Sequence, residues 1–392
     1  MNYILFDGPV RNALLPFTFT RPVADIRIGI LTIREKWEKH LGYTTTTLTE
    51  EYLMDKYPMV EMEENIMINA SFLPTEDMVE MIEGLNENQA LFSGDDVVAF
   101  YTKDTQENVD FDTYDIIEYS ADCIRVENPW DIFQKNDAAI REDFELLTNG
   151  RTSEPIPGSV NVIGHENIFI EEGAKLQFVT LNASTGPIYI GKDTEIMENS
   201  VIRGPFALCE GAQVKLATKV YGATTVGPHS RIGGEVNNSV LFGYSNKGHD
   251  GFLGNSVLGE WCNLGADTNN SNLKNNYDEV KLWSYETGRF AKTGTQFCGL
   301  MMGDHSKCGI NTMFNTGTVV GVSANIFGSG FPRNFVPSFS WGGASGFTTY
   351  ITKKAFETAR IVMSRRSVEF TEEDAAILEH VFEETKKWRK DE

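Results

Sequence analysis

Aliphatic residues recur at every sixth position through a long central part of this 392-residue chain. No helix repeats every six residues, and a half-buried strand alternates every two, so neither element explains this period. A six-residue period is typical of a hexapeptide β-helix, in which each hexad forms one flat side of a triangular coil. The first run consists of Ile190, Ile196, Ile202, Leu208, Val214, Val220, Val226 and Ile232. The second run consists of Met302, Cys308, Phe314, Val320 and Ile326.

The residue four places after each of these positions is usually small. We expect the aliphatic side chain to point into the coil and to stack on the one above, with the small residue lining the interior near the corner. Glycine often follows the aliphatic residue directly, where it permits a tight bend. These glycines are Gly191, Gly227, Gly233, Gly303, Gly309 and Gly321. The repeat does not reveal the hand of the coil.

The first 150 residues differ from this pattern. Strand-like runs alternate there with helical patterns, which predicts a parallel α/β layer domain. The strand-like runs lie at 3–6, 65–69 and 96–101, and the helical patterns at 30–40, 76–85 and 138–148. A segment with glycine and two prolines at 149–159 is typical of a domain boundary. We therefore expect an α/β domain over 1–150, a β-helix over 151–348 and a helical segment over 349–392.

The hexad pattern is interrupted between Thr268 and Met301, so this stretch must leave the coil as a long loop, and such loops are often functional. The pattern ends near Gly330, and the aromatic segment 331–346 is expected to wrap the final coil. Helices are expected at about 352–364 and 371–389. Thr371 and the acidic residues after it suit the start of the second helix, which we expect to cap an open sheet edge.

The composition excludes several classes of partner. A formal net charge of −22 argues against nucleic acid, because binding a phosphate backbone requires basic surface. No run of about 18 apolar residues occurs, so no membrane span is expected. The start MNYILFDG lacks the basic and apolar regions of a signal peptide. Five cysteines without a CxxC pattern indicate buried thiols in a reducing compartment, and we expect a cytoplasmic protein.

The residue with the clearest chemical potential is His249. It lies between Gly248 and Asp250, off the hexad frame, so we expect it at a corner or in a loop. An imidazole in that position can reach a substrate and act as a general base. The alternative interpretation is an ordinary surface histidine in a polar turn.

Two further features support a site near His249. The hexad step resumes at Leu258 and Leu264, so His249, Asn263 and Ala266 are expected on neighbouring coils. Asn263 and Asn276 can donate and accept hydrogen bonds to a sugar ring. Their alternative role is turn formation, because asparagine is common at bends.

The sequence KGHDGFLG, followed by SVLGEWCNLGADT and NNY, resembles the acetyltransferase half of the bifunctional UDP-N-acetylglucosamine pyrophosphorylase/glucosamine-1-phosphate N-acetyltransferase family. RGPFAL at 203–208 resembles the segment that opens that family's β-helix. LLPFTFTRPVADIRIGILTIREKW resembles the N-terminus of a shorter bacterial branch that is sugar nucleotidyltransferase-like, and this resemblance covers the whole chain. It implies an α/β nucleotidyltransferase-like domain, a left-handed parallel β-helix and assembly as a homotrimer.

The resemblance implies an enzyme of sugar-nucleotide biosynthesis that transfers an acetyl group from acetyl-CoA to an amino-sugar phosphate at the β-helix. His249 matches the catalytic base, and the backbone N–H of Ala266 matches the donor to the oxyanion. Arg333 is a candidate for binding a CoA phosphate. The substrate-binding residues that the resemblance implies are Lys247, Asn263, Asn276, Tyr277 and Lys281.

Three departures leave the acceptor sugar open. Phe252 stands where the family has a tyrosine, and the family's NYDG reads NYDE here. No lysine occupies the place of the family's main phosphate-binding lysine, near Asn237 and Asn238.

The N-terminal half departs further from the family. Its nucleotidyltransferases begin with a loop of the form LxAGxGTRMxxxxPK, whereas this chain has ILFDGPVRNALLPFTFTRP. Arg11 matches the loop arginine, and Arg21 is the candidate to replace the lysine. Asp7, Asn69 and Asp95 are the candidate ligands of Mg²⁺. An active N-terminal half would transfer a uridylyl or thymidylyl group from a nucleoside triphosphate to a sugar 1-phosphate; the alternative is a degenerate sugar-nucleotide-binding or structural domain.

Other functions remain open from the sequence. Trimeric β-helices also include γ-class carbonic anhydrases, and His229 and His305 share an outward hexad position that an interface metal could use. A non-catalytic sugar-nucleotide-binding trimer and an enzyme limited to nucleotidyl transfer are the remaining alternatives.

Overall fold

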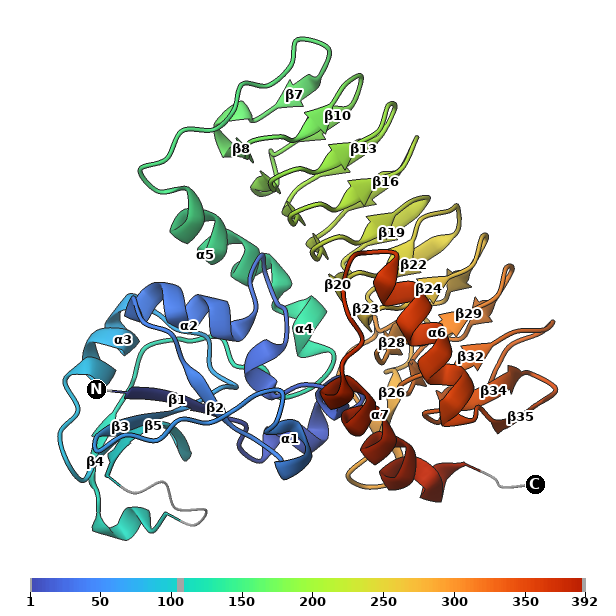
Figure 1. Cartoon of the computed structure of the whole chain (residues 1–392). Coiled ribbons are helices and arrows are strands. Elements are labelled where there is room, and N and C mark those ends of the chain that lie inside the picture. Colours follow the sequence, from blue (N-terminus) through green and yellow to red (C-terminus); the bar gives the residue numbers. More distant parts are fainter. Residues whose placement is uncertain (1, 104–108, 390–392) are drawn as a thin grey trace.

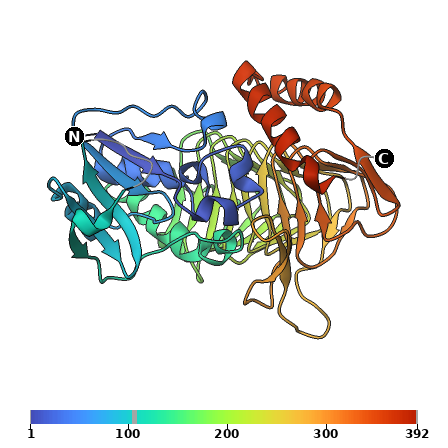
Figure 2. The same cartoon turned by 90° about the horizontal axis from the view of Figure 1, so that it is seen from below.

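The computed structural model describes residues 2–103 and 109–389. Three parts follow one another along the chain: an α/β layer, a long prism of β-strands and a pair of helices (Figure 1). The α/β layer lies beside the prism, and the final helices lie along its later coils (Figure 1 and Figure 2). The fold class expected from the sequence is thereby confirmed as an α/β domain, a parallel β-helix and C-terminal helices.

The N-terminal sheet has six strands in the order β2-β1-β3-β5-β4-β6. They are β1 (Asn2–Phe6), β2 (Thr46–Leu48), β3 (Asn65–Asn69), β4 (Gln89–Ser93), β5 (Asp96–Thr102) and β6 (Asp115–Glu118). The expectation of a purely parallel sheet is wrong, because β5 runs antiparallel to both β3 and β4. Only Gly94 and Asp95 separate β4 from β5. So short a connection can only reverse the chain, since a parallel crossover needs a dozen or more residues.

The three helices predicted in this domain are confirmed with small shifts of their ends. They are α2 (Ile33–Leu41), α3 (Glu76–Glu83) and α5 (Asn136–Thr148), and the shorter α1 (Val10–Ala13) and α4 (Asp131–Gln134) accompany them. Helix α2 begins with a capping box between Thr32 and Glu35 and ends at Gly42 with φ +72°. Both signals act locally and set the ends of α2, which begins three residues after the predicted start at residue 30.

The prism has three sides. Side 1 comprises β7 (Asn161–Ile163), β10 (Thr180–Asn182), β13 (Val201–Arg203), β16 (Lys219–Tyr221), β19 (Glu235–Asn237) and β22 (Phe252–Gly254), continued by the pair β25 (Asn269–Asn270) and β30 (Met313–Phe314). Side 2 comprises β8 (Ile168–Ile170), β11 (Ile188–Ile190), β14 (Phe206–Leu208), β17 (Thr224–Val226), β20 (Val240–Gly243), β23 (Val257–Glu260), β28 (Leu300–Met302), β31 (Thr318–Val320) and β33 (Phe335–Val336). Side 3 comprises β9 (Lys175–Leu176), β12 (Glu195–Ile196), β15 (Gln213–Val214), β18 (Arg231–Ile232), β21 (Asn246–Lys247), β24 (Asn263–Leu264), β29 (Lys307–Cys308), β32 (Asn325–Ile326), β34 (Ser340–Gly343) and β35 (Gly346–Thr349).

The hexad residues form columns inside the prism, as predicted. On side 3 Ile196 pairs with Val214, and Val214 pairs with Ile232 on the next coil. These side chains are almost fully buried and belong to one continuous hydrophobic cluster. Burial of a single aliphatic side chain of this size stabilises a fold by about 1.5–3 kcal/mol, so the repeat supplies a core despite the small cross-section of the prism.

Most of the glycines after the hexad residues have a different role from the one expected; Gly309 is an exception, because a Cβ atom there would meet nothing closer than 3.6 Å. Their φ angles are not in the left-handed region; that conformation is found two residues later, for example at Asp193 and His229. A Cβ atom on Gly227 would lie 2.0 Å from the carbonyl oxygen of Phe242 on the next coil. Glycine is therefore required there because successive coils approach closely, and not because the bend needs a positive φ.

The interruption of the repeat is an antiparallel hairpin of β26 (Lys281–Ser284) and β27 (Arg289–Lys292). The coil also continues past Gly330, because β33 and β34 still pair with the coil before them. The hairpin of β34 and β35 then ends side 3. The segment 331–346 therefore forms the final coil itself and does not wrap around it.

The C-terminal helices are α6 (Thr352–Ser364) and α7 (Glu372–Glu384), close to their predicted positions. A capping box of Thr371 and Asp374 starts α7. The expectation that α7 caps an open sheet edge is wrong. Its buried residues Ile377, Leu378 and Val381 join the cluster that also contains the N-terminal core, and Asp374 forms an ion pair with Lys56. This helix therefore bridges the prism and the N-terminal domain.

Other elements cover sides 2 and 3 of the prism, whereas side 1 leaves Val201 and Tyr221 exposed within the described residues. The outward residues Tyr189 and Ala207 of side 2 pack with Ile140 of α5, and Phe242 packs on Phe17 of the N-terminal domain. On side 3, Arg366 just after α6 donates a hydrogen bond to Asn246. Within the described residues no helix is long and apolar enough to cross a membrane.

Candidate functional site

His249 lies at the corner of the prism where side 3 passes into side 1, between β21 and β22. Its side chain is exposed and has no hydrogen-bond partner among the described residues. Gly251, two residues later, has φ +118°, and a Cβ atom there would lie 2.2 Å from the carbonyl oxygen of Thr268 on the next coil. A glycine is therefore needed for the chain to turn at this point, and His249 projects from a corner of fixed geometry.

The coil before His249 is shorter at the same corner. Ile232 pairs with Lys247, and Val236 pairs with Leu253. The chain takes four residues from Ile232 to Val236 but six from Lys247 to Leu253. The corner at Gly233 and Gly234 therefore has two residues fewer than the corner that carries His249. The chain around His249 is longer than the chain at the same corner of the preceding coil.

Ala266 occupies the same corner position on the next coil. The N–H of Asp267 donates to the carbonyl oxygen of Asp250 at 3.1 Å, which joins the two corners. The N–H of Ala266 has no acceptor among the described residues. The N–H groups of Leu216 and Ile310, at the equivalent positions of other coils, are also unpaired there. A free donor beside His249 is thus a regular property of this corner.

Asn263 lies on the outer face of side 3, as expected on a coil next to His249. It pairs with Asn246 on one side and Lys307 on the other, and its side chain is exposed. The structure therefore brings His249, Asn263 and Ala266 together on two neighbouring coils.

Lys247 has a different environment from the one that the resemblance implies. It occupies the inward column of side 3, directly above Ile232, and is 2 % exposed. Burial lowers the pKa of its ammonium group to about 8, although the carboxylates of Asp250 and Asp267 oppose this shift. An inward ammonium group is not placed to contact a substrate phosphate, so this position does not support the predicted role of Lys247.

Asn276 and Tyr277 lie in the loop between β25 and β26, at the corner where side 1 passes into side 2. Tyr277 is exposed, and Asn276 hydrogen-bonds to Asp278. Within one chain these two residues and His249 therefore lie at opposite corners of side 1.

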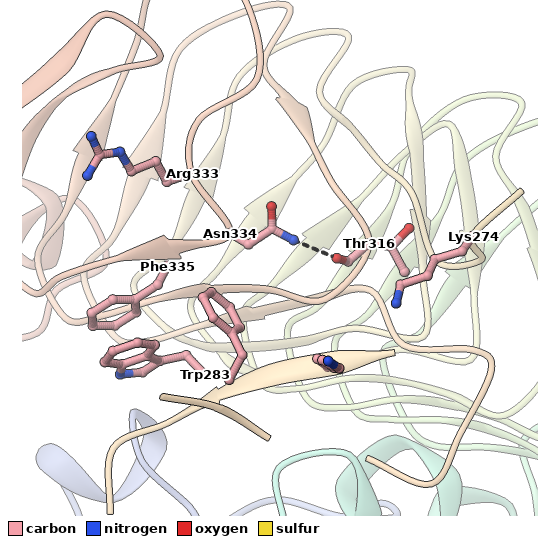
Figure 3. Close-up of a pocket in the computed structure, with 8 residues that line it drawn as sticks. Lys274, Trp283, Thr316, Arg333, Asn334 and Phe335 are labelled. Atoms are coloured by element: carbon pink, nitrogen blue, oxygen red, sulfur yellow. Dashed lines mark hydrogen bonds between the residues drawn. The ribbon is translucent and has the colours of Figure 1, made fainter. Parts of the chain in front are cut away.

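The structure brings Lys281 and Arg333 into one pocket of about 640 Å³, shown in Figure 3. The sequence did not reveal the other members of this site. Trp283 stacks on Phe335 with 4.1 Å between ring centroids. The remaining lining residues are Lys274, Phe290, Thr316 and Asn334.

The N-terminal candidates for binding a nucleotide are occupied by contacts within the protein. Arg11 is 8 % exposed and donates to the carbonyl oxygen of Thr18 and to the hydroxyl of Tyr52. Its Nε lies 3.4 Å from the carboxylate of Asp7. Burial raises the pKa of the Asp7 carboxyl to about 6, and its oxygens accept hydrogen bonds from the N–H of Val23 and the hydroxyl of Thr49.

Arg21 faces the β-helix. It is 3 % exposed and forms two hydrogen bonds to the Asp304 carboxylate, at 3.1 and 2.5 Å. Thr20 donates to the same carboxylate at 2.7 Å. Arg21 therefore connects the N-terminal domain to the corner between sides 2 and 3, and its guanidinium is not available to a triphosphate.

The three candidate magnesium ligands lie at one edge of the N-terminal sheet but do not form a site. Asn69 uses its oxygen to accept hydrogen bonds from Ser71 and its nitrogen to donate to Val97. Asp95 is exposed in the turn between β4 and β5. Because the oxygens of Asp7 and Asn69 already have protein donors, these residues do not fit a Mg²⁺ ion.

His229 and His305 do not share a metal site within this chain. Both lie at the corner between sides 2 and 3, but the rings of Tyr244 and Trp261 stack between them. Burial lowers the pKa of His305 well below its usual value. No group of three or more potential metal ligands from His, Cys, Asp and Glu occurs in the part of the chain that the structure describes.

Comparisons with known proteins match the start of the chain to one family and parts of the chain to bifunctional enzymes. Residues 3–152 match the family described as sugar nucleotidyl transferase. The bifunctional sugar-1-phosphate nucleotidylyltransferase/acetyltransferase of Sulfurisphaera tokodaii is 29% identical over 190 residues, which cover 43% of this chain and 47% of that protein. The bifunctional protein GlmU of Methanocaldococcus jannaschii is 27% identical over 206 residues, covering 50% of this chain and 41% of that protein.

A third relative, the bifunctional protein GlmU of Trichodesmium erythraeum, is 31% identical over 109 residues, covering 27% of this chain and 22% of that protein. A solved structure of the Arabidopsis UDP-N-acetylglucosamine acyltransferase is 14% identical to this chain, with a TM-score of 0.22. The match covers 54% of this chain and 80% of the acyltransferase chain. The chain spans less than half the length of each curated relative named here. By sequence the chain resembles the bifunctional sugar-1-phosphate nucleotidylyltransferases/acetyltransferases, and its residues 3–152 match the sugar nucleotidyl transferase family.

Proposed function

We propose that the β-helix transfers an acetyl group from acetyl-CoA to the amine of an amino-sugar phosphate, a step of sugar-nucleotide biosynthesis. The observation that carries this proposal is the pairing of an exposed imidazole, His249, with the unpaired N–H of Ala266 at the same corner of two successive coils. The first group can accept a proton and the second can donate to an oxygen that gains negative charge, which are the two requirements of acyl transfer.

The chain's own residues would act as follows. Acetyl-CoA supplies an acetyl thioester when it is bound. His249 accepts the proton that the substrate amine loses as its nitrogen forms a bond to the carbonyl carbon. The N–H of Ala266 donates to the carbonyl oxygen, and one such donor typically lowers the barrier by about 3–4 kcal/mol. The bond from carbon to sulfur then breaks, and the thiolate takes up a proton.

The sugar contacts belong to the same proposal. Asn263 presents its amide on the outer face of side 3, next to the corner that carries His249. Asn276 and Tyr277 lie at the other corner of side 1 in the same chain. They would therefore reach the His249 site from a neighbouring protomer, which requires an oligomer.

We propose a homotrimer that packs through side 1 and its corners. Large apolar side chains are exposed there on a chain whose charge is otherwise strongly negative. Exposed apolar groups gathered on one side of a protein are typical of an interface. They are Phe178, Val201, Leu216, Tyr221, Ile310 and Met313. Five free cysteines agree with the cytoplasm, which we propose as the location of the protein.

Nucleotidyl transfer at the N-terminal domain is the second candidate function, and the family match of residues 3–152 favours it. The geometry does not, because Arg11 and Arg21 are buried in contacts with the protein and each oxygen of the Asp7 carboxylate accepts a hydrogen bond from the protein. We therefore assign no step of nucleotidyl transfer to these residues, and we propose that the domain mainly supports side 2 of the β-helix.

The test uses the full chain with acetyl-CoA and a panel of amino-sugar phosphates, and it follows the release of CoA thiol. We expect turnover with at least one acceptor and a loss of about 10²- to 10⁴-fold in His249→Ala. His165→Ala is the control, because His165 is also an exposed histidine but lies at the first coils. Absence of thiol release with every acceptor would refute acetyl transfer and favour a non-catalytic sugar-nucleotide-binding protein. A parallel assay of pyrophosphate release, with Mg²⁺, each nucleoside triphosphate and a sugar 1-phosphate, tests the second candidate.

A further inference from the structure

The pocket that contains Lys281 and Arg333 lies away from His249, beside the hairpin of β26 and β27. Its walls come from two parts of the chain that are distant in sequence. The hairpin and the loop before it supply Lys274, Lys281, Trp283 and Phe290, and the final coils supply Thr316, Arg333, Asn334 and Phe335. Figure 3 shows Trp283 and Phe335 face to face in one part of the pocket and Lys274 in another.

The pocket is positively charged within an acidic protein. Lys274, Lys281 and Arg333 line it, and no carboxylate does. None of these three cations has an ion pair within 4.0 Å among the described residues; Lys274 donates only to the backbone carbonyl of Glu279. The chain carries 56 acidic and 34 basic residues, so three unpaired cations around one cavity are not expected from composition. Such a group is suited to phosphate oxygens.

Aromatic rings form the remaining wall. Trp283 and Phe335 are stacked with an interplanar angle of 9°, and Phe290 meets Trp283 edge-on at 5.4 Å. Phe290 is 45% exposed, so part of its ring is open to a ligand. The Nε1 of Trp283 is buried without a hydrogen-bond partner in the described part of the chain. Planar bases bind to aromatic side chains by stacking, which is worth about 1–3 kcal/mol for each base.

The pocket is rigid because its walls are anchored in the core. Leu282 and Tyr285, on the hairpin, are buried, and Tyr285 packs edge-on against Phe19 of the N-terminal domain and Trp388 after α7. On the opposite wall Asn334 donates a hydrogen bond to the carbonyl oxygen of Thr316 at 2.9 Å. A site held in this way needs little ordering when a ligand binds.

We propose that this pocket binds a nucleotide, with its phosphates on Lys281, Arg333 and Lys274 and its base against the ring of Phe290. The volume of about 640 Å³ is in the range of small-ligand sites. The nucleotide end of CoA and a sugar nucleotide both carry a planar base together with phosphate groups. The proposal concerns binding alone and does not depend on the reaction at His249, which lies at the other corner of side 1.

The experiment titrates the full chain with adenosine 3′,5′-bisphosphate, with UDP and with inorganic pyrophosphate, and follows heat and tryptophan fluorescence. We expect at least one nucleotide to bind in the micromolar range and to quench Trp283. Lys281→Ala and Arg333→Ala should each weaken binding about tenfold or more, and Phe290→Ala should weaken it several-fold. His249→Ala should bind the nucleotide with the same affinity as the unchanged protein. Nucleotide binding can therefore be tested whether or not the protein transfers an acetyl group.

Arg289→Ala is the matched control. Arg289 is a cation on the same hairpin, but it pairs with Ser284 and does not line the pocket. Preference for adenosine bisphosphate would identify the acetyl donor as the source of the nucleotide, and preference for UDP would identify a sugar nucleotide; both support the proposal. It would be overturned by no binding at millimolar nucleotide, by equal affinity for pyrophosphate and nucleotides, or by unchanged binding in Lys281→Ala and Arg333→Ala proteins that retain the native melting temperature.

Discussion

The ammonium group of Lys247 donates a hydrogen bond to the carbonyl oxygen of His249, with 2.5 Å between nitrogen and oxygen. The lysine side chain is inside the prism and the histidine side chain is outside it. The interior of the β-helix thus contacts the backbone of the residue that we propose as the catalytic base. A buried lysine at a position that isoleucine occupies on the coil below is costly for stability, because its charge loses water.

The first prediction concerns the pH dependence of stability. The folded pKa of Lys247 is lowered to about 8, and an unfolded lysine has a pKa of about 10.4. As the pH rises, the folded state therefore loses this proton before the unfolded state does. Lys247 lowers the free energy of unfolding most below about pH 8, where it is charged in both states. This loss of stability disappears as the pH rises from about 8 to 10. We expect Lys247→Met to be more stable than the unchanged protein at pH 7 by about 1–3 kcal/mol, with a smaller difference at pH 9.5. Urea unfolding at the two pH values measures this. A difference that does not change with pH would contradict it.

The same substitution tests whether Lys247 positions His249. Loss of the hydrogen bond to the His249 carbonyl leaves the corner less fixed, so acetyl transfer should fall roughly ten- to hundredfold although stability rises. The fall is expected in kcat, with little change in KM for the amino sugar. Ile232→Met, a neutral change in the same column, is the control and should leave kcat nearly unchanged.

The second prediction concerns the connection between the domains. Arg21→Met leaves the Asp304 carboxylate buried without its cation, which should lower the free energy of unfolding by about 3–5 kcal/mol. Lys219→Met removes an exposed ion-pair partner of Glu235. This substitution should change the free energy of unfolding by no more than about 1 kcal/mol. Urea unfolding followed by circular dichroism compares the two. Equal small losses would show that the Arg21 pair does not hold the domains together.

The third prediction concerns the interior column. Ile232→Ala should destabilise the protein by about 2–5 kcal/mol, because a coil held from both sides cannot close the cavity that is left. Ile361→Ala, the same substitution at a residue of α6 that is 63% exposed, should stay within about 0.5 kcal/mol. Thermal unfolding measures both variants. Similar melting temperatures would contradict the role of the column as the core.

The fourth prediction concerns assembly. Ile310 is 70% exposed at the corner that carries His249. If this corner lies in a trimer interface, Ile310→Glu should convert a trimer to monomers without loss of secondary structure, because a buried carboxylate there would be unpaired. Light scattering after size-exclusion chromatography measures the mass. Ile361→Glu, on α6, should retain the mass of the unchanged protein. A monomeric unchanged protein, or a trimeric Ile310→Glu, would refute the proposed interface.

The sequence determined the elements whose signals are local or periodic. The hexads from Ile190 to Ile232 predicted the β-helix, because every coil repeats the same inward position. Thr371 and the acidic residues after it marked the start of α7, because a cap acts within one helical turn. His249 and Ala266 could be placed on neighbouring coils by counting, since the repeat converts sequence distance into spatial distance.

Only the tertiary structure decided the features that depend on contacts between distant segments. Lys281 and Arg333 were candidates from the sequence, but the pocket also needs Trp283 and Phe290 of the hairpin and Phe335 from a later coil. Arg21 was a candidate for binding a phosphate by sequence. In the structure its guanidinium forms an ion pair with Asp304 of the β-helix, which is distant in sequence. The resemblance implied that Lys247 binds substrate, but Lys247 lies in the inward column above Ile232. Three coil sides take 15 residues from Ile232 to Lys247 instead of 18, and the inward position of a side chain depends on that count.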